Sequence, residues 1–255
     1  GSVLGPILYI LYTSDLPQTP GITLATFADD TALLSSSIDP AMASFNLQVA
    51  LDEISQWLSD WKIKVNEGKS QHVTFTMATA TCPPITLNNV PLPQVDEVKY
   101  LGIHFDRRLI WRSHIWKKRL QLNLKTQKLN WLIGNHSKLS VENKLLVYKV
   151  ILKPIWTYGI QLWGTASNTN IDIIQRYQSK TLRRILQAPW YVNNQIIHND
   201  TNTPSVRDTI TKLSNIYQLK LEDHPNHLAV NLLDNSQCVF RLKRHSILDL
   251  GNRFQ

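Results

Sequence analysis

The sequence ITLATFADDTALLS at residues 22–35 decides the fold of the N-terminal part of this chain. Two β-prone runs, 23–27 and 31–35, flank the adjacent carboxylates Asp29 and Asp30, which predicts a β-hairpin with both acids at its turn. Carboxylates between apolar strands are costly unless a metal ion or cations neutralise them, and hard cations such as Mg²⁺ prefer oxygen ligands. Asp also favours solvated turns, so these two residues alone fit either a metal site or an ordinary turn.

Helices are expected on both sides of this hairpin. Residues 6–12 predict a short buried helix with Pro6 in its first turn. Asp39 predicts the N-cap of a second helix that opens at Pro40. Apolar residues of that helix recur every three or four positions and predict one core-facing stripe, formed by Leu47, Leu51, Ile54, Leu58 and Trp61.

Short strands are expected further along. Residues 71–77 predict a strand, and residues 85–92 predict a hairpin whose two-asparagine turn tolerates positive φ. Residues 98–105 predict another strand with Gly102 in its middle. A glycine at that position indicates close approach of another backbone or of a ligand.

After residue 106 the pattern changes to helices, which we expect at about 112–133, 140–163 and 169–187. The chain beyond Pro189 is polar and irregular, and a further helical region is expected around 205–234. The fold class predicted from these patterns is therefore α+β, with strands confined to the N-terminal part.

The charge reverses where the pattern changes. Residues 1–105 carry 4 Lys and Arg against 10 Asp and Glu, residues 106–190 carry 16 against 3, and residues 191–255 carry 7 against 6. An acidic segment followed by a strongly basic one indicates a carboxylate site beside a polyanion-binding surface. The alternative is that the basic residues only solvate the faces of helices.

Composition excludes several classes of protein. With 43% hydrophobic and 18% charged residues, the chain is not disordered, collagen-like or membrane-embedded. Its two cysteines exclude a disulfide scaffold and fit a reducing, intracellular compartment. The most apolar stretch, 145–164, contains Lys149, Lys153 and Pro154, which predicts a buried, kinked helix and no membrane partner.

The helix expected at 169–187 separates its charges from its apolar residues. At about 100° per residue, one arc holds the cations Arg176, Lys180, Arg183 and Arg184. The opposite side, expected to face the core, holds Ile171, Ile174, Leu182, Ile185 and Leu186. Four like charges on one narrow face repel one another, which predicts contact with a phosphate backbone and no reading of bases.

Taken together, the motifs resemble reverse transcriptases of non-LTR retrotransposons of the LINE and jockey-like kind. The resemblance also reaches the basic helices and residues 145–163, and nearly the whole chain is covered. It is carried by Gly1-Ser2-Val3-Leu4-Gly5-Pro6, Phe27-Ala28-Asp29-Asp30, Asn66-Glu67-Gly68-Lys69 and Tyr100-Leu101-Gly102-Ile103.

This resemblance implies a fold and a set of site residues. Residues 1–105 would be a partial palm, 106–190 a basic, all-helical thumb, and 191–255 a helical or irregular extension. Asp29 would ligate catalytic Mg²⁺, or Mn²⁺, with Asp30 as its auxiliary, and Lys69 would be an acid beside the pyrophosphate. The residues that would contact template, primer or nucleotide are Gly1, Ser2, Gly5, Pro6, Phe27, Ala28, Tyr100, Leu101 and Gly102.

The implied partners are an RNA template, a DNA primer, a dNTP and the N-terminal part of the polyprotein. In the resembling family another strand with a metal-binding Asp lies upstream of the Gly-Ser-Val motif, so we expect a C-terminal fragment that does not polymerise alone. Nuclear localisation is expected for target-primed integration. Two alternatives remain: a non-catalytic fragment that binds nucleic acid through its basic helices, and a remnant with no activity.

Overall fold

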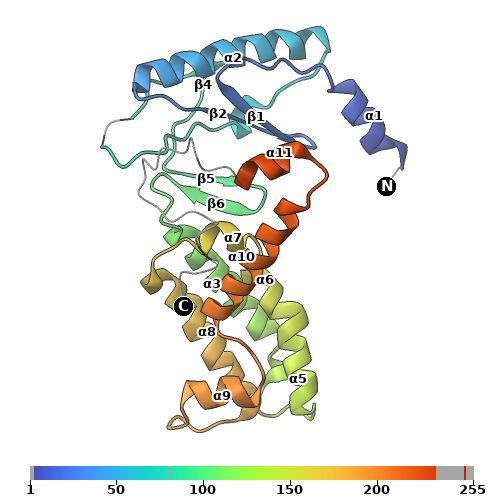
Figure 1. Cartoon of the computed structure of the whole chain (residues 1–255), viewed down its shortest axis with the longest axis vertical. Coiled ribbons are helices and arrows are strands. Elements are labelled where there is room, and N and C mark those ends of the chain that lie inside the picture. The colour runs from blue at the N-terminus through green and yellow to red at the C-terminus, as the bar shows by residue number, and fades with distance from the viewer. Residues whose placement is uncertain (1–2, 80, 234–249, 251–255) are drawn as a thin grey trace. The chain divides into compact units, whose positions relative to one another are not determined.

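The computed structural model describes residues 3–79, 81–233 and 250. Its backbone forms two compact units, Gly1–Gly102 and Ile103–Gln255, called unit 1 and unit 2 below (Figure 1). In the described part, short antiparallel hairpins precede a mostly helical region. This arrangement confirms the mixed α+β class.

The predicted hairpin is present in unit 1. Strand β1 (Ile22–Phe27) pairs antiparallel with β2 (Asp30–Ser35), so that Phe27 lies opposite Asp30. The two turn residues are Ala28 and Asp29, and Ala28 has a φ of 51°. A non-glycine residue in the left-handed region stores backbone strain, which two antiparallel strands of six residues hold in place.

Helix α2 (Pro40–Asp60) begins as the sequence predicts. The Asp39 side chain accepts a hydrogen bond of 2.9 Å from the amide of Ala41, and Pro40 occupies the first turn. Figure 1 shows α2 lying across the β1–β2 hairpin. Its predicted stripe is buried only in the middle, at Leu51 and Ile54. Leu51 there joins a small core with Ile85, Leu87 and Leu92.

Helix α1 (Leu4–Tyr12) exists, but the prediction that it is buried is wrong. None of its residues is buried, and Ile7, Leu8, Ile10 and Leu11 are more than half exposed. Two tyrosine hydroxyls attach the helix to the rest of unit 1. Tyr9 donates to the carbonyl of Ala28 (2.8 Å), and Tyr12 donates to the carbonyl of Trp61 (2.6 Å).

The strand predicted at 71–77 is not formed as a ladder. Only His72 makes a bridge, to Gln94, with its amide donating to the carbonyl of Pro93 (3.0 Å). Prolines at 91 and 93 cannot donate to a ladder, which limits the pairing that this neighbouring segment can offer.

The hairpin predicted at 85–92 is confirmed. It consists of β3 (Thr86–Leu87) and β4 (Val90–Pro91), and its turn residues Asn88 and Asn89 have φ values of 52° and 61°. Asparagine tolerates such values because its short polar side chain compensates locally.

The strand predicted at 98–105 is instead two strands, β5 (Glu97–Tyr100) and β6 (Ile103–Asp106). Leu101 and Gly102 between them have φ values of 45° and 76°. Gly102 therefore occupies a turn that needs positive φ. The prediction that it lies in the middle of a strand is wrong.

Unit 2 is built from the predicted helices. They are α3 (Arg112–Lys128), α4 (Asn130–Ile133), α5 (Val141–Val147), the π-helix η2 (Tyr148–Leu152), α6 (Lys153–Thr157), α7 (Ile160–Trp163) and α8 (Asn168–Leu186). The region 140–163 is thus one kinked succession of helical pieces, as the embedded Pro154 predicts. Within the described residues, no helix is both long and apolar enough to cross a membrane.

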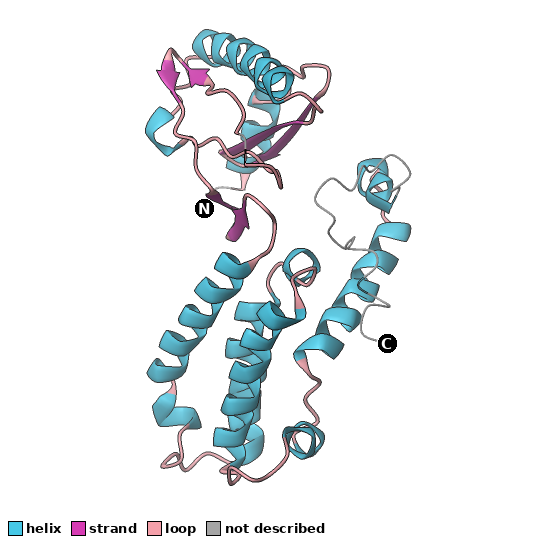
Figure 2. Cartoon of the chain, turned by 90° about the vertical axis from the view of Figure 1, so that its left-hand side faces the viewer, coloured by secondary structure: helices cyan, strands magenta, loops and turns pink. Residues whose placement is uncertain are grey.

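The C-terminal part of unit 2 is more helical than predicted. Helix α9 (Asn194–Asp200) lies in the region expected to be irregular, and α10 (Val206–Glu222), α11 (His227–Val230) and the 3-10 helix η3 (Asn231–Leu233) follow. Figure 2 shows helices of this unit running alongside one another. Its core takes residues from α3 through α10, among them Ile115, Trp156, Ile174, Leu182 and Ile210.

Candidate functional site

The carboxylate pair lies at the exposed tip of the β1–β2 hairpin. Asp29 is in the two-residue turn, and Asp30 begins β2 opposite Phe27. All three are exposed, and the Phe27 side chain is 64% exposed. The expectation that apolar strands enclose these acids is therefore wrong for this structure, because both strands are themselves largely exposed near the tip.

Tyr9 contacts the hairpin tip, which the sequence analysis did not predict. Its hydroxyl donates to the carbonyl of Ala28, the strained turn residue next to Asp29. The hydrogen bond connects α1 to the hairpin tip and fixes the backbone from which the Asp29 carboxylate projects. The available signal was chemical: a tyrosine in an otherwise apolar helix has a polar tip that needs a partner.

Asp29 and Asp30 could supply only part of the ligands that a metal site needs. Mg²⁺ takes near-octahedral oxygen coordination, and two-metal phosphoryl transfer needs ligands on both sides of the reacting phosphate. Among the described residues no group of three or more His, Cys, Asp or Glu side chains could hold a metal ion. The donor chemistry of the pair fits Mg²⁺ or Mn²⁺, but further oxygen ligands are required.

The other residues expected at this site are only partly brought together. Gly5 and Pro6 lie in the first half of α1, and the Tyr100 hydroxyl is 3.5 Å from the carbonyl of Ala25 on β1, at the outer limit of a hydrogen bond. Gly1 and Ser2 lie outside the described residues.

Lys69 is not brought to the hairpin by any interaction that the described part of the chain shows. It ends the short 3-10 helix η1 (Glu67–Lys69), where its amide donates to the Asn66 side chain (3.1 Å), and its own side chain is exposed.

Three of the four cations predicted on the basic face of α8 are exposed, namely Arg176, Lys180 and Arg184. Arg183 is different: its guanidinium donates to the carbonyl of Pro189, to the carbonyl of Val192 (2.7 Å) and to the Asn194 side chain (2.9 Å). It holds the segment that follows α8, so in this structure its donors serve that segment, whereas the sequence analysis expects them to face phosphate. The opposite face packs in the core as expected, with Leu186 partly buried.

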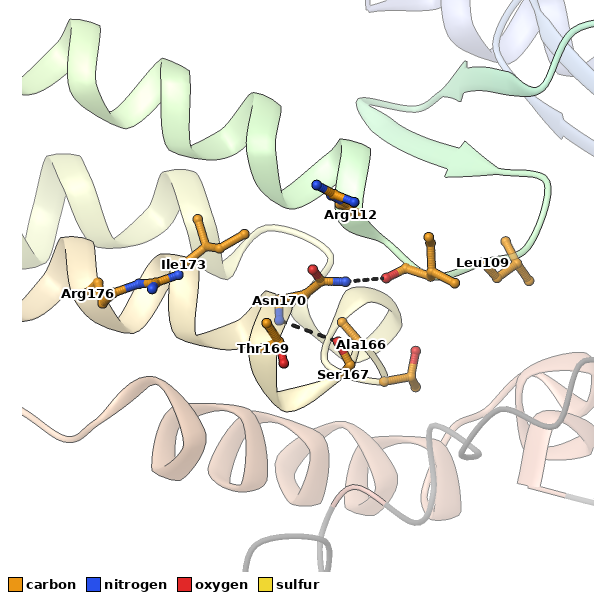
Figure 3. Close-up of a pocket in the computed structure, with 10 residues that line it drawn as sticks. Leu109, Arg112, Ala166, Ser167, Thr169, Asn170, Ile173 and Arg176 are labelled. Carbon is orange, nitrogen blue, oxygen red and sulfur yellow. Dashed lines mark hydrogen bonds between the residues drawn. The ribbon is translucent and has the colours of Figure 1, made fainter.

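A hollow between α3 and α8 brings Arg112, which the sequence analysis did not assign, together with Arg176, which it did. Figure 3 shows Arg112, Asn170, Ile173 and Arg176 around this hollow. Its volume is about 460 Å³. The Asn170 side chain donates to the carbonyl of Ile110 (3.1 Å) and so holds the start of α8 against the segment before α3.

A second hollow shares Ile173 and Arg176 with the first and continues along the same helices. Its remaining lining includes Trp116, Arg119 and Lys180. The two hollows together are called the α3–α8 groove, and among the described residues no carboxylate lines either of them. Such a surface attracts phosphate.

Arg119 is held in place within this groove. Its guanidinium donates to the Asn123 side chain and lies over the Tyr177 ring, 4.8 Å from the ring centroid. Burial lowers the pKa of Arg119 from its ordinary value, yet an arginine stays protonated in proteins. The groove therefore presents a fixed positive charge that only the spacing of basic residues on α3 could have indicated.

Comparisons with known proteins agree with these features. Residues 1–105 match the family "Reverse transcriptase (RNA-dependent DNA polymerase)". The chain is 41% identical over 99% of its length to the probable RNA-directed DNA polymerase from transposon X-element of Drosophila melanogaster, and it spans 28% of that protein. It is 38% identical over 99% of its length to the RNA-directed DNA polymerase from mobile element jockey of Drosophila funebris, of which it spans 29%. No solved structure matches.

Proposed function

Because this chain belongs to the reverse transcriptases of jockey and X-element type non-LTR retrotransposons, we propose that it forms the C-terminal palm and the thumb of an RNA-directed DNA polymerase. Residues 1–105 would be the palm part, 106–190 the thumb and 191–255 a C-terminal extension. The observation that carries the proposal is the exposed hairpin with Ala28 and Asp29 at its tip, inside the segment that matches the family.

The proposed reaction is template-directed nucleotidyl transfer. The primer 3′-hydroxyl oxygen forms a bond to the α-phosphorus of a dNTP, the bond to the β-phosphate breaks, pyrophosphate leaves, and the hydroxyl proton is released. Bound Mg²⁺ or Mn²⁺ would supply charge neutralisation at the attacking and leaving oxygens. Asp29 would be a ligand and Asp30 its auxiliary, while the remaining oxygen ligands would come from other parts of the polyprotein and from the nucleotide.

Other residues would handle the substrates. Phe27, Ala28 and the segment of α1 around Gly5 would lie near the primer end and the nucleotide, and the turn at Tyr100-Leu101-Gly102 would hold the primer strand. Lys69 would protonate the leaving pyrophosphate. The partners would be an RNA template, a DNA primer and a dNTP, and the place of action would be the nucleus, where an element integrates.

The positive charge of the thumb would bind the duplex of RNA template and DNA primer. Arg112, Arg119, Arg176 and Lys180 of the α3–α8 groove, with Arg184 beyond it, would contact phosphates without reading bases. This assignment fits the absence of carboxylates among the described residues that line the groove.

Primer extension on an RNA template tests the proposal. In a polyprotein that contains this segment, Asp29→Asn should abolish extension, because the change removes the ligand charge and keeps the size. Asp60→Asn, at the exposed end of α2, is the matched control and should leave extension unchanged. Extension by the Asp29→Asn protein at the unaltered rate would disprove the assignment.

A second candidate function is nucleic-acid binding without catalysis by this chain. It is favoured by the cationic groove, which lies entirely in unit 2 and needs no residue of the hairpin. The isolated chain should then bind duplexes equally well with and without Asp29→Asn, and it should show no primer extension in either form. Extension by the isolated chain would contradict this candidate.

A further inference from the structure

The segment that connects α8 to α9 exposes two large aromatic side chains. Trp190 is 88% exposed and Tyr191 is 72% exposed. Their neighbours Ala188 and Val192 are partly buried and pack against the core of unit 2. The segment thus turns its small residues inward and its largest residues outward, the reverse of what burial of apolar surface favours.

The exposed pair is held by a structured backbone. Arg183 donates to the carbonyls of Pro189 and Val192, on either side of the pair, and to Asn194 at the start of α9. Arginine has five donors in a rigid plane, which suits such multiple contacts. The ring centroids of Trp190 and Tyr191 lie 5.9 Å apart at an interplanar angle of 81°. One arginine therefore holds the backbone on both sides of the two exposed rings.

The surroundings of this pair in the sequence are cationic. Between residues 173 and 199 the charged residues are Arg176, Lys180, Arg183 and Arg184, with no Asp or Glu. Lys180 and Arg184 lie within one helical turn of Arg183 and are exposed. Exposed aromatic rings that follow exposed cations closely in the sequence are a combination suited to single-stranded nucleic acid, in which bases stack on rings and phosphates meet the charges.

We infer that Trp190 and Tyr191 form a stacking platform for unpaired bases of a single-stranded nucleic acid whose phosphates lie against Lys180 and Arg184. The inference rests on the proposed function only in taking nucleic acid as the ligand, and it adds a site for the unpaired strand. A duplex offers no free base face within its length, so it gains nothing from the rings. A proline-rich peptide could pack on the rings but would gain nothing from the cations.

Fluorescence anisotropy of the whole chain with a labelled single-stranded oligo(U) and a blunt RNA–DNA duplex of equal length tests this inference. Trp190→Ala should weaken binding of the single strand about 5- to 150-fold, since each stacked base contributes about 1–3 kcal/mol. Binding of the duplex should change less than about twofold, because its bases are already stacked. The salt slope for the single strand should stay unchanged, because no charge is removed.

Three further variants sharpen the test. Trp190→Phe should keep most of the affinity for the single strand because a ring remains. Tyr191→Ala should weaken it in the same selective way. Tyr158→Ala is the matched control: Tyr158 is also exposed, lies under the Lys118 ammonium group at 5.1 Å, and is outside the proposed platform, so its loss should leave affinity for the single strand unchanged.

Equal weakening of single-strand and duplex binding by Trp190→Ala, or unchanged binding of both, would overturn the inference. Tighter binding of a proline-rich peptide than of oligo(U), abolished in Trp190→Ala, would also overturn it in favour of a protein partner. Thermal unfolding of the Trp190→Ala chain checks that the fold is kept. Failure of the polymerase proposal is separate, since it is read from primer extension by the Asp29→Asn polyprotein.

Discussion

Helix α1 in unit 1 and helix α8 in unit 2 both carry large apolar residues, yet they are held in opposite ways. Helix α8 buries Ile171, Ile174, Leu182 and Ile185 in an extended core. Helix α1 buries none of its residues and is attached through two tyrosine hydroxyls. The α3–α8 groove is thus formed by helices that pack in an extended core, whereas the carboxylate hairpin packs against a small core.

The contrast between the buried α8 and the exposed α1 indicates where each unit obtains its stability. A helix that is apolar on all sides is typical of a buried position, so the exposed α1 marks a surface of unit 1 that is suited to contact with further protein. We expect unit 1 to be the less protected half of the chain and to promote self-association, because its apolar helix and its strands are exposed.

The largest expected effect comes from truncating the two units in the same way. Trp156→Ala, at a fully buried position of α6, should destabilise unit 2 by about 3–5 kcal/mol. Ile7→Ala in α1, where the side chain is 54% exposed, should cost less than about 0.5 kcal/mol. Hydrogen exchange read segment by segment measures both. Equal costs, or uniform protection across the two units, would show that the contrast between them is wrong.

The next effect sharpens the contrast in charge. Changing Arg176, Lys180 and Arg184 together to Gln should flatten the slope of log K against log[salt] for duplex binding by about 2–3, at 0.7–0.9 for each phosphate that is no longer neutralised. Arg183→Gln should leave that slope unchanged and instead loosen the segment after α8, since its donors serve that segment. Titration of a duplex at several salt concentrations measures the slopes. A slope unchanged by the triple substitution would show that these residues only solvate the face of the helix.

Two glycines at positive φ provide a smaller comparison. A Cβ on Gly159, at φ 64°, would overlap Cδ1 of the buried Ile103, whereas a Cβ on Gly21, at φ 79°, would meet nothing within 4 Å. Gly21→Ala should therefore cost about 1 kcal/mol from backbone strain alone. Gly159→Ala should cost about 1–3 kcal/mol more, because the core must shift. Denaturant unfolding with probes in each unit tests whether Gly159→Ala costs more stability than Gly21→Ala. A larger cost at Gly21 would show that the space around Gly21 is not open.

The smallest effect is a pH dependence of unit 1. Burial lowers the pKa of His72 from its ordinary value of 6.5, so protonation favours the unfolded state. The stability from this histidine is complete above about pH 6.5 and is lost as the pH falls through that value towards the folded pKa. His72→Gln should reduce the loss of stability between about pH 7.5 and 5.5, as measured by urea unfolding at both pH values. An unaltered loss would assign the pH dependence to other groups.

Features decided by local chemistry were predictable from the sequence. The β1–β2 hairpin, the Asp39 cap and the asparagine turn at residues 88–89 depend on a few neighbouring residues, and each is present. The segment at 71–77 failed because the pairing of a strand depends on its neighbour, and here that neighbour contains two prolines.

The candidate site was only partly predictable for the same reason. The place of Asp29 in the turn follows from its sequence motif, but its exposure depends on what covers β1 and β2. The role of Arg183 depends on a chain that returns to the helix after a turn, which helical periodicity cannot show. The contribution of α3 to the groove depends on how two helices pack, and the pattern within one helix does not determine that.

The π-helix η2 has a consequence for how chains of this kind can vary in length. The amide of Lys153 donates to the carbonyl of Tyr148, five residues earlier, so this turn holds one residue more than an α-helical turn. Pro154 follows at once and has no amide to continue an ordinary ladder. A one-residue deletion within 148–152 would restore α-helical spacing but rotate everything before it by about 100° relative to Trp156. Homologues aligned across this region should therefore place their single-residue gaps elsewhere. We expect the number of residues in this segment to be constant among them, because the packing of the core depends on it.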